Sequence, residues 1–166
     1  MAKRIIAISV ILALILCFCS CAPQQSNEEK PTEDTKVETN VNVDLKKLYD
    51  DCVAKMPEMI SLDDEMTLNF CGINVADCEE CYVSICADSL RADEIWLVKT
   101  KDEKAAQKIV DLANARIQAK ADESITYSPE QHAVVQKAEI IINGQYVAVV
   151  VSPDVSTIAE IVNNAF

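Results

Sequence analysis

Apolar positions recur along this chain with two different periods, and each period predicts a different kind of element. Between residues 45 and 56 the apolar residues follow helical spacing, which places them on one face of an amphipathic helix. They are Leu45, Leu48, Tyr49, Cys52, Val53 and Met56. Pro57 follows directly and is expected to end the helix. The folded part of the chain is therefore expected to begin near Asp44 with a helix.

In two later segments successive side chains alternate between two opposite faces, which is typical of strands. In "CEECYVSICA", Cys81, Val83 and Ile85 fall on one face and Tyr82, Ser84 and Cys86 on the other. In "ADEIWLVKT", Ile95 and Leu97 oppose Trp96 and Val98. The short "DSLRA" segment between them predicts an antiparallel hairpin.

Helical spacing returns after the second strand. Thr100 and Glu103 fit a capping box, and the buried stripe of a long helix over about residues 100–120 follows. That stripe consists of Ala106, Ile109, Val110, Ala113 and Ile117. A second helix start follows, with Ser128 as N-cap, Pro129 at the first helical position and Gln131 closing the box.

The last third of the chain predicts a second hairpin and a terminal helix. Asn143-Gly144 lies between two β-rich runs, as a tight primed turn requires. Ser152-Pro153 is expected to open the terminal helix, whose apolar side carries Val155, Ile158, Ile161, Val162 and Phe166. The segment "ISLDDEMTLNFCGI" has no clear period, and a short helix or a turn stopping at Gly72 both fit it.

These elements predict an α+β fold, a two-layer domain spanning residues 44–166. Two β-hairpins in a ββαββα-like order would form one antiparallel sheet. The helices would pack on one face of that sheet, and the first helix would precede it. No internal repeat is evident beyond the echo of the ββα unit.

The first forty residues differ from the rest in pattern. Lys3 and Arg4 precede the uncharged apolar run "IIAISVILALIL", whose length is typical of a signal peptide and short for a membrane-spanning helix. Residues 1–20 are therefore expected to be a signal peptide. Residues 21–43 are polar and without periodicity, which predicts a disordered tether.

Three cysteines, Cys17, Cys19 and Cys21, end the apolar run. The segment resembles the lipobox of bacterial lipoproteins, in which a small residue precedes the cysteine that receives the lipid. Only Cys21 fits, because Ser20 precedes it, although Phe18 stands three positions back where leucine is usual. The resemblance implies lipid attachment at Cys21 and a location on the outer face of the cell membrane. An uncleaved anchor and plain secretion are the rival interpretations.

Composition excludes several classes of function. The formal charge of −12 would become −14 once Lys3 and Arg4 are removed with the signal peptide. A surface this acidic repels nucleic-acid phosphates, so nucleic acid is not an expected partner. Two glycines are too few for a glycine-rich phosphate loop, and the single histidine, His132, excludes sites that need two imidazoles.

Three stretches, "ADEIWLVKTKD", "YSPEQ" and "NGQYVAVVVSPD", occur in an order that resembles domain-of-unknown-function family 4358, a family of bacterial lipoproteins from Firmicutes. The resemblance covers roughly residues 44–166. It implies an exported lipoprotein with a signal peptide and a polar tether. The family has no established activity, ligand or catalytic residues, so it implies no chemistry.

The candidate chemistry lies in the remaining cysteines and in the "YSPEQ" stretch. Four thiolates from Cys71, Cys78, Cys81 and Cys86 would satisfy tetrahedral zinc, and Cys78-x-x-Cys81 has ligand spacing. Strand alternation argues against this set, because it sends Cys81 and Cys86 to opposite faces. A disulfide and buried free thiols are the other interpretations, and the last is favoured. Tyr127 and Glu130 are candidate binding residues, since helix capping does not require them.

We therefore expect a membrane-anchored, extracytoplasmic lipoprotein with a non-enzymatic binding or accessory role and no cofactor. Its partners would be the membrane, through the lipid, and an envelope protein or ligand that the sequence does not identify. One alternative is an exported thiol- or zinc-dependent protein that uses the four cysteines. A structural component of the cell envelope is the other.

Overall fold

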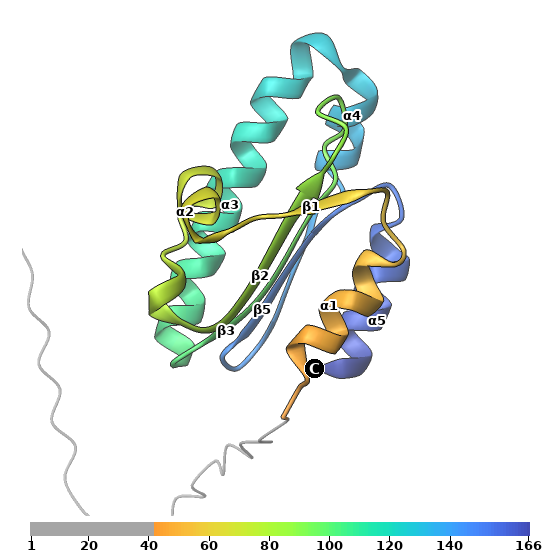
Figure 1. Cartoon of the computed structure of the whole chain (residues 1–166). Helices are drawn as coiled ribbons and strands as arrows, with labels where there is room; N and C mark the ends of the chain where they lie inside the picture. The colour runs from red at the N-terminus through yellow and green to blue at the C-terminus, as the bar shows by residue number, and fades with distance from the viewer. Residues whose placement is uncertain (1–41) are drawn as a thin grey trace, which may run out of the picture. The chain divides into compact units, whose positions relative to one another are not determined.

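A five-stranded antiparallel sheet organises the protein, whose computed structural model describes residues 42–166. Figure 1 shows the sheet nearly edge-on with helices on either side. In chain order the elements are α1 (Leu45–Val53), β1 (Met59–Ser61), α2 (Asp64–Cys71), the 3-10 helix η1 (Val75–Asp77), β2 (Cys78–Cys86), β3 (Glu94–Thr100), α3 (Glu103–Tyr127), α4 (Pro129–Val135), β4 (Glu139–Asn143), β5 (Tyr146–Val151) and α5 (Val155–Ala165).

The two predicted hairpins are present and form one sheet. The strand order is β1-β2-β3-β5-β4, and β3 joins the hairpins by pairing antiparallel with β5, where Leu97 lies opposite Ala148. The β4–β5 turn has Gly144 at φ +58°, as the Asn-Gly pair predicted. The α+β fold is confirmed. The short edge strand β1, which pairs with β2, is an addition that the sequence pattern did not predict.

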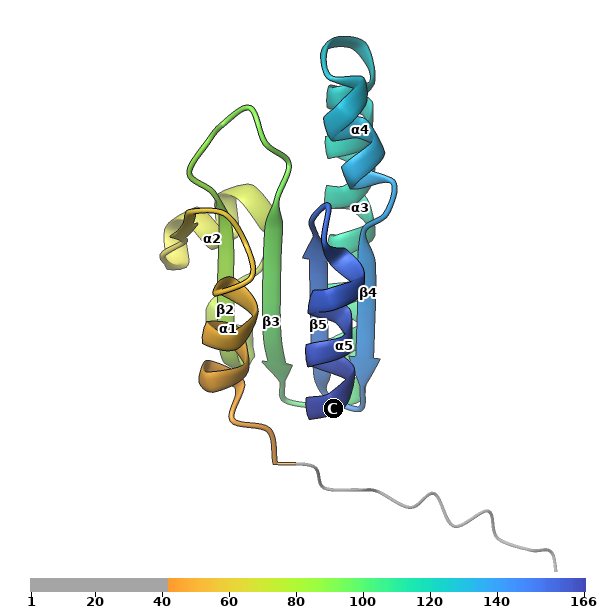
Figure 2. The same ribbon diagram turned by 90° about the vertical axis from the view of Figure 1, so that its right-hand side faces the viewer.

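Helices cover both faces of the sheet, so the prediction of a single helical face is wrong. On one face Ile95 and Leu97 pack with residues of α1 and α5, and on the other Trp96 and Val98 pack with residues of α2 and α3. Figures 1 and 2 show α1 and α5 together on one side and α3 on the other. The physical reason is visible in β5, where all six residues are buried, because an interior strand that is apolar on both faces needs two covering layers.

Helix starts follow local chemistry, with one correction. The α3 helix begins after Asp102, whose carboxylate accepts a hydrogen bond from the Ala105 backbone N–H at 2.7 Å. Thr100 is therefore not the N-cap. It still belongs to β3, where its buried hydroxyl donates to the backbone carbonyls of Asp102 and Gln145. Asp102, two positions later, is the N-cap because its carboxylate accepts a hydrogen bond from a backbone N–H of the first turn that has no partner within the helix.

The junction between α3 and α4 sets the geometry of the site described below. Ser128 ends α3 by donating its backbone N–H to the Ser124 carbonyl, and its hydroxyl caps α4 by accepting from the Gln131 N–H. Gln131 was expected to close a capping box. Its side-chain carbonyl instead accepts from the Ala92 backbone N–H at 2.8 Å, which ties α4 to the loop between β2 and β3.

The predicted signal peptide, Cys21 and the tether up to residue 41 lie outside the described residues. Within residues 42–166, no helix combines the length and the apolarity needed to cross a membrane.

Candidate functional site

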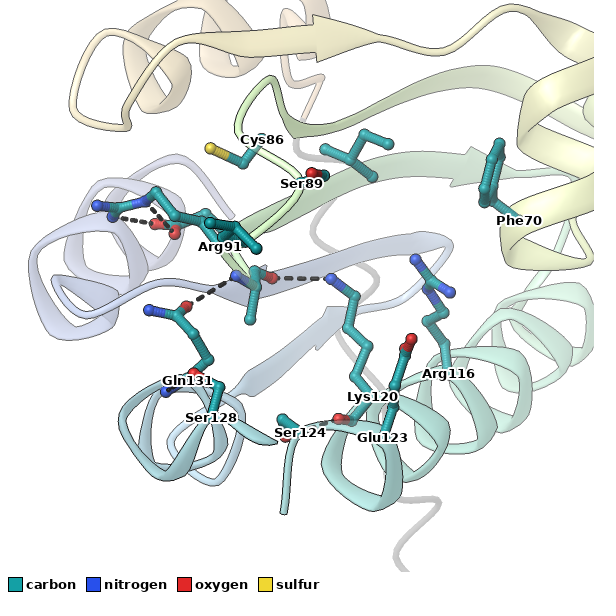
Figure 3. A pocket seen from close by; sticks show the side chains of 14 residues that line it. Phe70, Cys86, Ser89, Arg91, Arg116, Lys120, Glu123, Ser124, Ser128 and Gln131 are labelled. Carbon is teal, nitrogen blue, oxygen red and sulfur yellow. Dashed lines mark hydrogen bonds and ion pairs between the residues drawn. The ribbon is translucent and has the colours of Figure 1, made fainter. Parts of the chain in front are cut away.

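A pocket of about 230 Å³ opens where the β2–β3 loop meets the C-terminal half of α3, α4 and the end of α2. In Figure 3 the side chains of Arg116, Lys120 and Gln131 rise from the helices toward the loop that carries Arg91. Phe70 lies across from Arg116 at the side of the pocket. Cationic, polar and apolar side chains thus meet in one hollow at the end of the sheet.

Glu94, the first residue of β3, lies behind the lining of this pocket and connects its cationic residues. One carboxylate oxygen accepts from the Trp96 indole N–H at 2.7 Å, and the Arg116 guanidinium donates to both oxygens at 3.0–3.3 Å. The Lys120 ammonium lies 2.8 Å from Oε2. The Glu94 side chain is only 1% exposed, whereas those of Arg116 and Lys120 are 23% and 12% exposed. Two cations therefore hold one buried carboxylate and still face solvent.

The electrostatics of the cluster keep Glu94 ionised. Burial raises the pKa of Glu94, but the Lys120 ammonium and the Arg116 guanidinium outweigh that effect, so the pKa lies below its ordinary value. Burial lowers the pKa of Arg116, and its hydrogen bonds and charge pairing with Glu94 more than reverse the shift. The three groups form a fixed array of charges beneath the pocket.

The β2–β3 loop is held over the pocket by contacts to both helices. Lys120 donates to the Ala92 carbonyl at 2.8 Å, while Gln131 accepts from the Ala92 N–H. Arg91 pairs with the buried carboxylate of Asp93 through two hydrogen bonds of 3.0 and 3.3 Å. The "ADEI" and "YSPEQ" stretches, which the sequence singled out separately, thus meet at Ala92 and Gln131.

Ser124 and His132 lie close together near the pocket, but their hydrogen bonds indicate a structural contact. The His132 Nδ1 atom lies 3.0 Å from the Ala121 carbonyl, and because that oxygen only accepts, Nδ1 carries the hydrogen. Ser124 Oγ, 3.4 Å from Nδ1, donates to the Lys120 carbonyl at 2.8 Å. Nδ1 therefore has no lone pair with which to activate the serine. The pair ties α4 to α3.

The predicted binding residues lie on either side of the junction between α3 and α4. Glu130 is exposed in the first turn of α4 and does not line the pocket, and Tyr127 is the last residue of α3. Cys21, the predicted lipid attachment site, lies outside the described residues. Sequence reasoning missed the residues that do build the site, namely Arg91, Arg116 and Lys120.

A signal for the missed cations exists in the sequence. Arg116 and Lys120 are four positions apart on the long helix, so they lie on one face, next to the apolar stripe. Basic residues there must find a carboxylate on the element that the stripe covers, and β3 begins with Asp93-Glu94. Charge patterning on the long helix could therefore have indicated the cluster.

Of the four candidate metal-binding cysteines, three lie in one apolar cluster on the α3 side of the sheet: Cys71, Cys78 and Cys81. A β-bulge shifts the register between Cys78 and Glu80, so Cys78 and Cys81 both pack against the α3 side of the sheet. Cys71 lies at the end of α2, its sulfur 4.0 Å from Glu94, and Cys86 lies at the opposite end of β2 from Cys78 and lines the pocket. Strand alternation alone did not predict the pairing, because the bulge adds one residue.

The described cysteines are all free thiols, with environments that differ strongly. Burial, with a smaller contribution from Asp51, raises the pKa of Cys52 to about 11. Burial and then Glu94 raise the pKa of Cys71 to about 12. A hydrogen bond from Cys81 lowers the pKa of Cys78 and raises that of Cys81. Over residues 42–166, the structure contains no group of three or more His, Cys, Asp or Glu side chains arranged to hold a metal ion.

Comparison with known proteins identifies the family. Neither a search of curated proteins nor a search of solved structures found a match to the chain. The model of one family, described as "Domain of unknown function (DUF4358)", matches residues 51–152, which extend from α1 to just beyond β5. The match includes β2, β3, α3 and α4 and therefore the whole pocket, and since it covers more than half of the sequence, the chain belongs to the DUF4358 family.

Proposed function

We propose that this protein is a lipid-anchored, extracytoplasmic module that binds a small ligand in the pocket between the β2–β3 loop and the α3–α4 junction. The observation that carries the proposal is that the pocket is pre-formed. Its loop is fixed to both helices through Ala92, and its cations are fixed by Glu94. Binding sites of this kind spend little free energy on ordering their side chains.

Native mass spectrometry tests the binding part of the proposal. The full chain, purified in mild detergent, is incubated with a small-molecule extract of the cells that produce it. We expect a bound species that is lost in Arg116→Lys, which keeps the charge beside Glu94 but changes the donor geometry. Lys55→Arg, in the turn that follows α1 and outside the lining of the pocket, serves as the control. If the wild-type chain and Arg116→Lys retain the same molecules, the pocket is not the binding site.

The anchor is proposed from the sequence and is tested by metabolic labelling. Cells expressing the chain are grown with radioactive palmitate, and we expect the label to enter the protein through Cys21. Cys21→Ala should abolish labelling, and Cys19→Ala, two positions earlier, should not. Labelling that persists in Cys21→Ala would exclude attachment at that residue.

A second candidate, a thiol-dependent function, is favoured by one observation. The bulge in β2 places Cys78 and Cys81 on the same side of the sheet. Reactive thiols are counted in the folded and unfolded chain, with and without reductant, and bound metal is measured by elemental analysis. Stoichiometric metal, or a Cys78–Cys81 disulfide in the protein isolated from cells, would favour this candidate. Five thiols that are unreactive in the folded chain and free of metal would remove it.

A further inference from the structure

In the network behind the pocket, the hydrogen-bond acceptors already receive hydrogen bonds from protein donors. Both oxygens of Glu94 accept from Trp96, Arg116 and Lys120, and both oxygens of Asp93 accept from Arg91. The Ala92 carbonyl accepts from Lys120, and the Gln131 side-chain carbonyl accepts from the Ala92 N–H. The acceptors of this network are therefore occupied within the protein, whereas the Glu123 carboxylate and the Ser89 hydroxyl line the pocket outside the network.

The donors, in contrast, are only partly used. An arginine has five N–H donors, and Arg116 uses its Nε and one hydrogen of Nη2 on Glu94. Arg91 likewise uses Nε and Nη2 on Asp93. Within the described residues, neither Nη1 group and no hydrogen of the Gln131 side-chain nitrogen takes part in a hydrogen bond, although all three residues line the pocket. The pocket is therefore rich in donors and suits a ligand that accepts hydrogen bonds.

The pocket also has an apolar side. Phe70, at the end of α2, lines it while remaining 48% exposed, and Leu90 in the β2–β3 loop is 79% exposed. Figure 3 places the Phe70 ring on the side to which the Arg116 guanidinium points. An apolar body seated beside Phe70 would cover part of this exposed surface. A bare inorganic anion would leave that surface in water.

Charge and size narrow the ligand further. The chain as a whole carries −12, so anions are repelled at long range, and their binding must come from contacts inside the pocket. Its volume of about 230 Å³ lies below the roughly 300–1,000 Å³ of sites for drug-sized ligands, so the ligand is small. One exposed carboxylate, Glu123, lines the pocket and opposes an anion.

From this surplus of donors beside an apolar wall we propose that the pocket binds a small organic anion. Its carboxylate or phosphate accepts hydrogen bonds from the unused donors of Arg116, and its apolar body packs against Phe70, which Figure 3 places on the same side of the pocket. This inference rests on the proposed binding function and adds the chemical class of the ligand.

Four aromatic probes of similar size and different charge, together with inorganic phosphate, test the ligand class. Benzoate, phenyl phosphate, benzamide, benzylamine and inorganic phosphate are titrated into the isotopically labelled full chain, and the backbone amide signals of Leu90 and Ala92 are followed by NMR. We expect benzoate or phenyl phosphate to shift these signals with a dissociation constant on the order of 1 mM, as suits a fragment of this size. The stronger of the two identifies the anionic group. Benzamide, benzylamine and inorganic phosphate should bind at least tenfold more weakly.

Matched variants assign the binding to the pocket. Glu123→Gln should tighten benzoate binding about threefold by removing the opposing charge, whereas Glu160→Gln on α5 should not change it. Phe70→Ser should weaken it about fivefold, whereas Leu68→Ser, an equally exposed apolar position on the same helix that does not line the pocket, should not. These positions are exposed, so the variants are expected to fold.

Two results would overturn the inference, and they differ in what they mean for the proposed function. If benzamide or benzylamine shifts the Leu90 and Ala92 signals more than the anions do, the ligand class is wrong and the binding function stands. If no probe shifts them, or if Glu123→Gln weakens benzoate binding, the anion site is excluded. The mass-spectrometric experiment on the cell extract then decides the binding function independently.

Discussion

Among single residues, Glu94 is the one on which the pocket most depends. It is buried at 1% exposure and paired with Arg116 and Lys120, so replacing it removes the shared partner of two partly buried cations. We expect Glu94→Gln to lower the free energy of unfolding by about 3 kcal/mol. Urea denaturation measures the change. The control is Glu79→Gln, which removes a solvent-screened pair with Lys99 at the surface and should cost much less. Equal losses in the two variants would contradict this role for Glu94.

The ionisation of Glu94 should also make the free energy of unfolding depend on pH. The cations make the pKa of Glu94 lower in the folded chain than in the unfolded chain, where it is about 4.3. As the pH falls, the Glu94 carboxylate therefore takes up its proton in the unfolded chain before it does so in the folded chain. The stabilisation that the ionised carboxylate provides is complete above the unfolded pKa and is lost as the pH falls through the folded pKa. The difference in unfolding free energy between the wild type and Glu94→Gln should shrink from about pH 5 downward. A difference that stays constant to about pH 3 would show that the pairing contributes nothing.

The thiols of α1, α2 and β2 also differ residue by residue. The hydrogen bond from Cys81 lowers the pKa of Cys78, whereas burial raises those of Cys52 and Cys71 to about 11 and 12. With iodoacetamide near pH 8, we expect Cys78 to be alkylated first and Cys52 and Cys71 only after unfolding. Timed mass spectrometry of the peptides measures the order. Cys78→Ser should remove the fast reaction, and a faster reaction at Cys71 would be incompatible with its burial.

Among the elements, the end of α2 depends on glycine. Gly72 has φ +73°, and a Cβ atom there would lie 3.0 Å from Leu112 Cδ2 on α3, whereas Gly144 has φ +58° and open space around it. Gly144→Ala should cost about 1 kcal/mol through the backbone alone. Gly72→Ala should cost about 1 kcal/mol more, because the α2–α3 contact must also shift. Thermal unfolding of the two variants measures the difference, and identical melting temperatures would show that Leu112 yields without cost.

The strands and helices with a regular period were predictable, and those that depend on distant partners were not. The helical stripes of α1 and α5 and the alternation of β3 record burial directly, so they gave the right elements. β1 has three residues and no period, and the bulge in β2 changes the facing of Cys78 by one position. From the sequence alone Gln131 resembles a capping residue, because its actual partner, Ala92, belongs to the distant β2–β3 loop.

The site was less predictable than the fold for a related reason. Arg91, Arg116 and Lys120 come from a loop and a helix, and only the packing of α3 on β3 brings the last two to Glu94. The two helical layers were missed because the apolar run of β5 does not by itself show whether the strand lies inside the sheet or at its edge. Its six buried residues became informative once its position between β3 and β4 was known.

At the scale of the whole molecule, the proposed lipid has to hold the protein at the membrane by itself. The mature chain would carry −14, so anionic head groups repel it and add no attraction. Attachment through acyl chains, at roughly 0.8 kcal/mol per buried CH₂, is insensitive to salt, whereas electrostatic attachment is weakened by it.

This contrast makes the anchor testable by fractionation. We expect the full chain to remain with the membrane pellet after a wash at about 1 M salt, where charges are screened within roughly 3 Å, and to be released by detergent. Cys21→Ala should either pass to the soluble fraction after cleavage or remain with an intact signal peptide and a larger mass, and immunoblotting separates these two forms. Release of the wild-type chain by salt alone would show that protein contacts, and not a lipid on Cys21, hold it at the membrane.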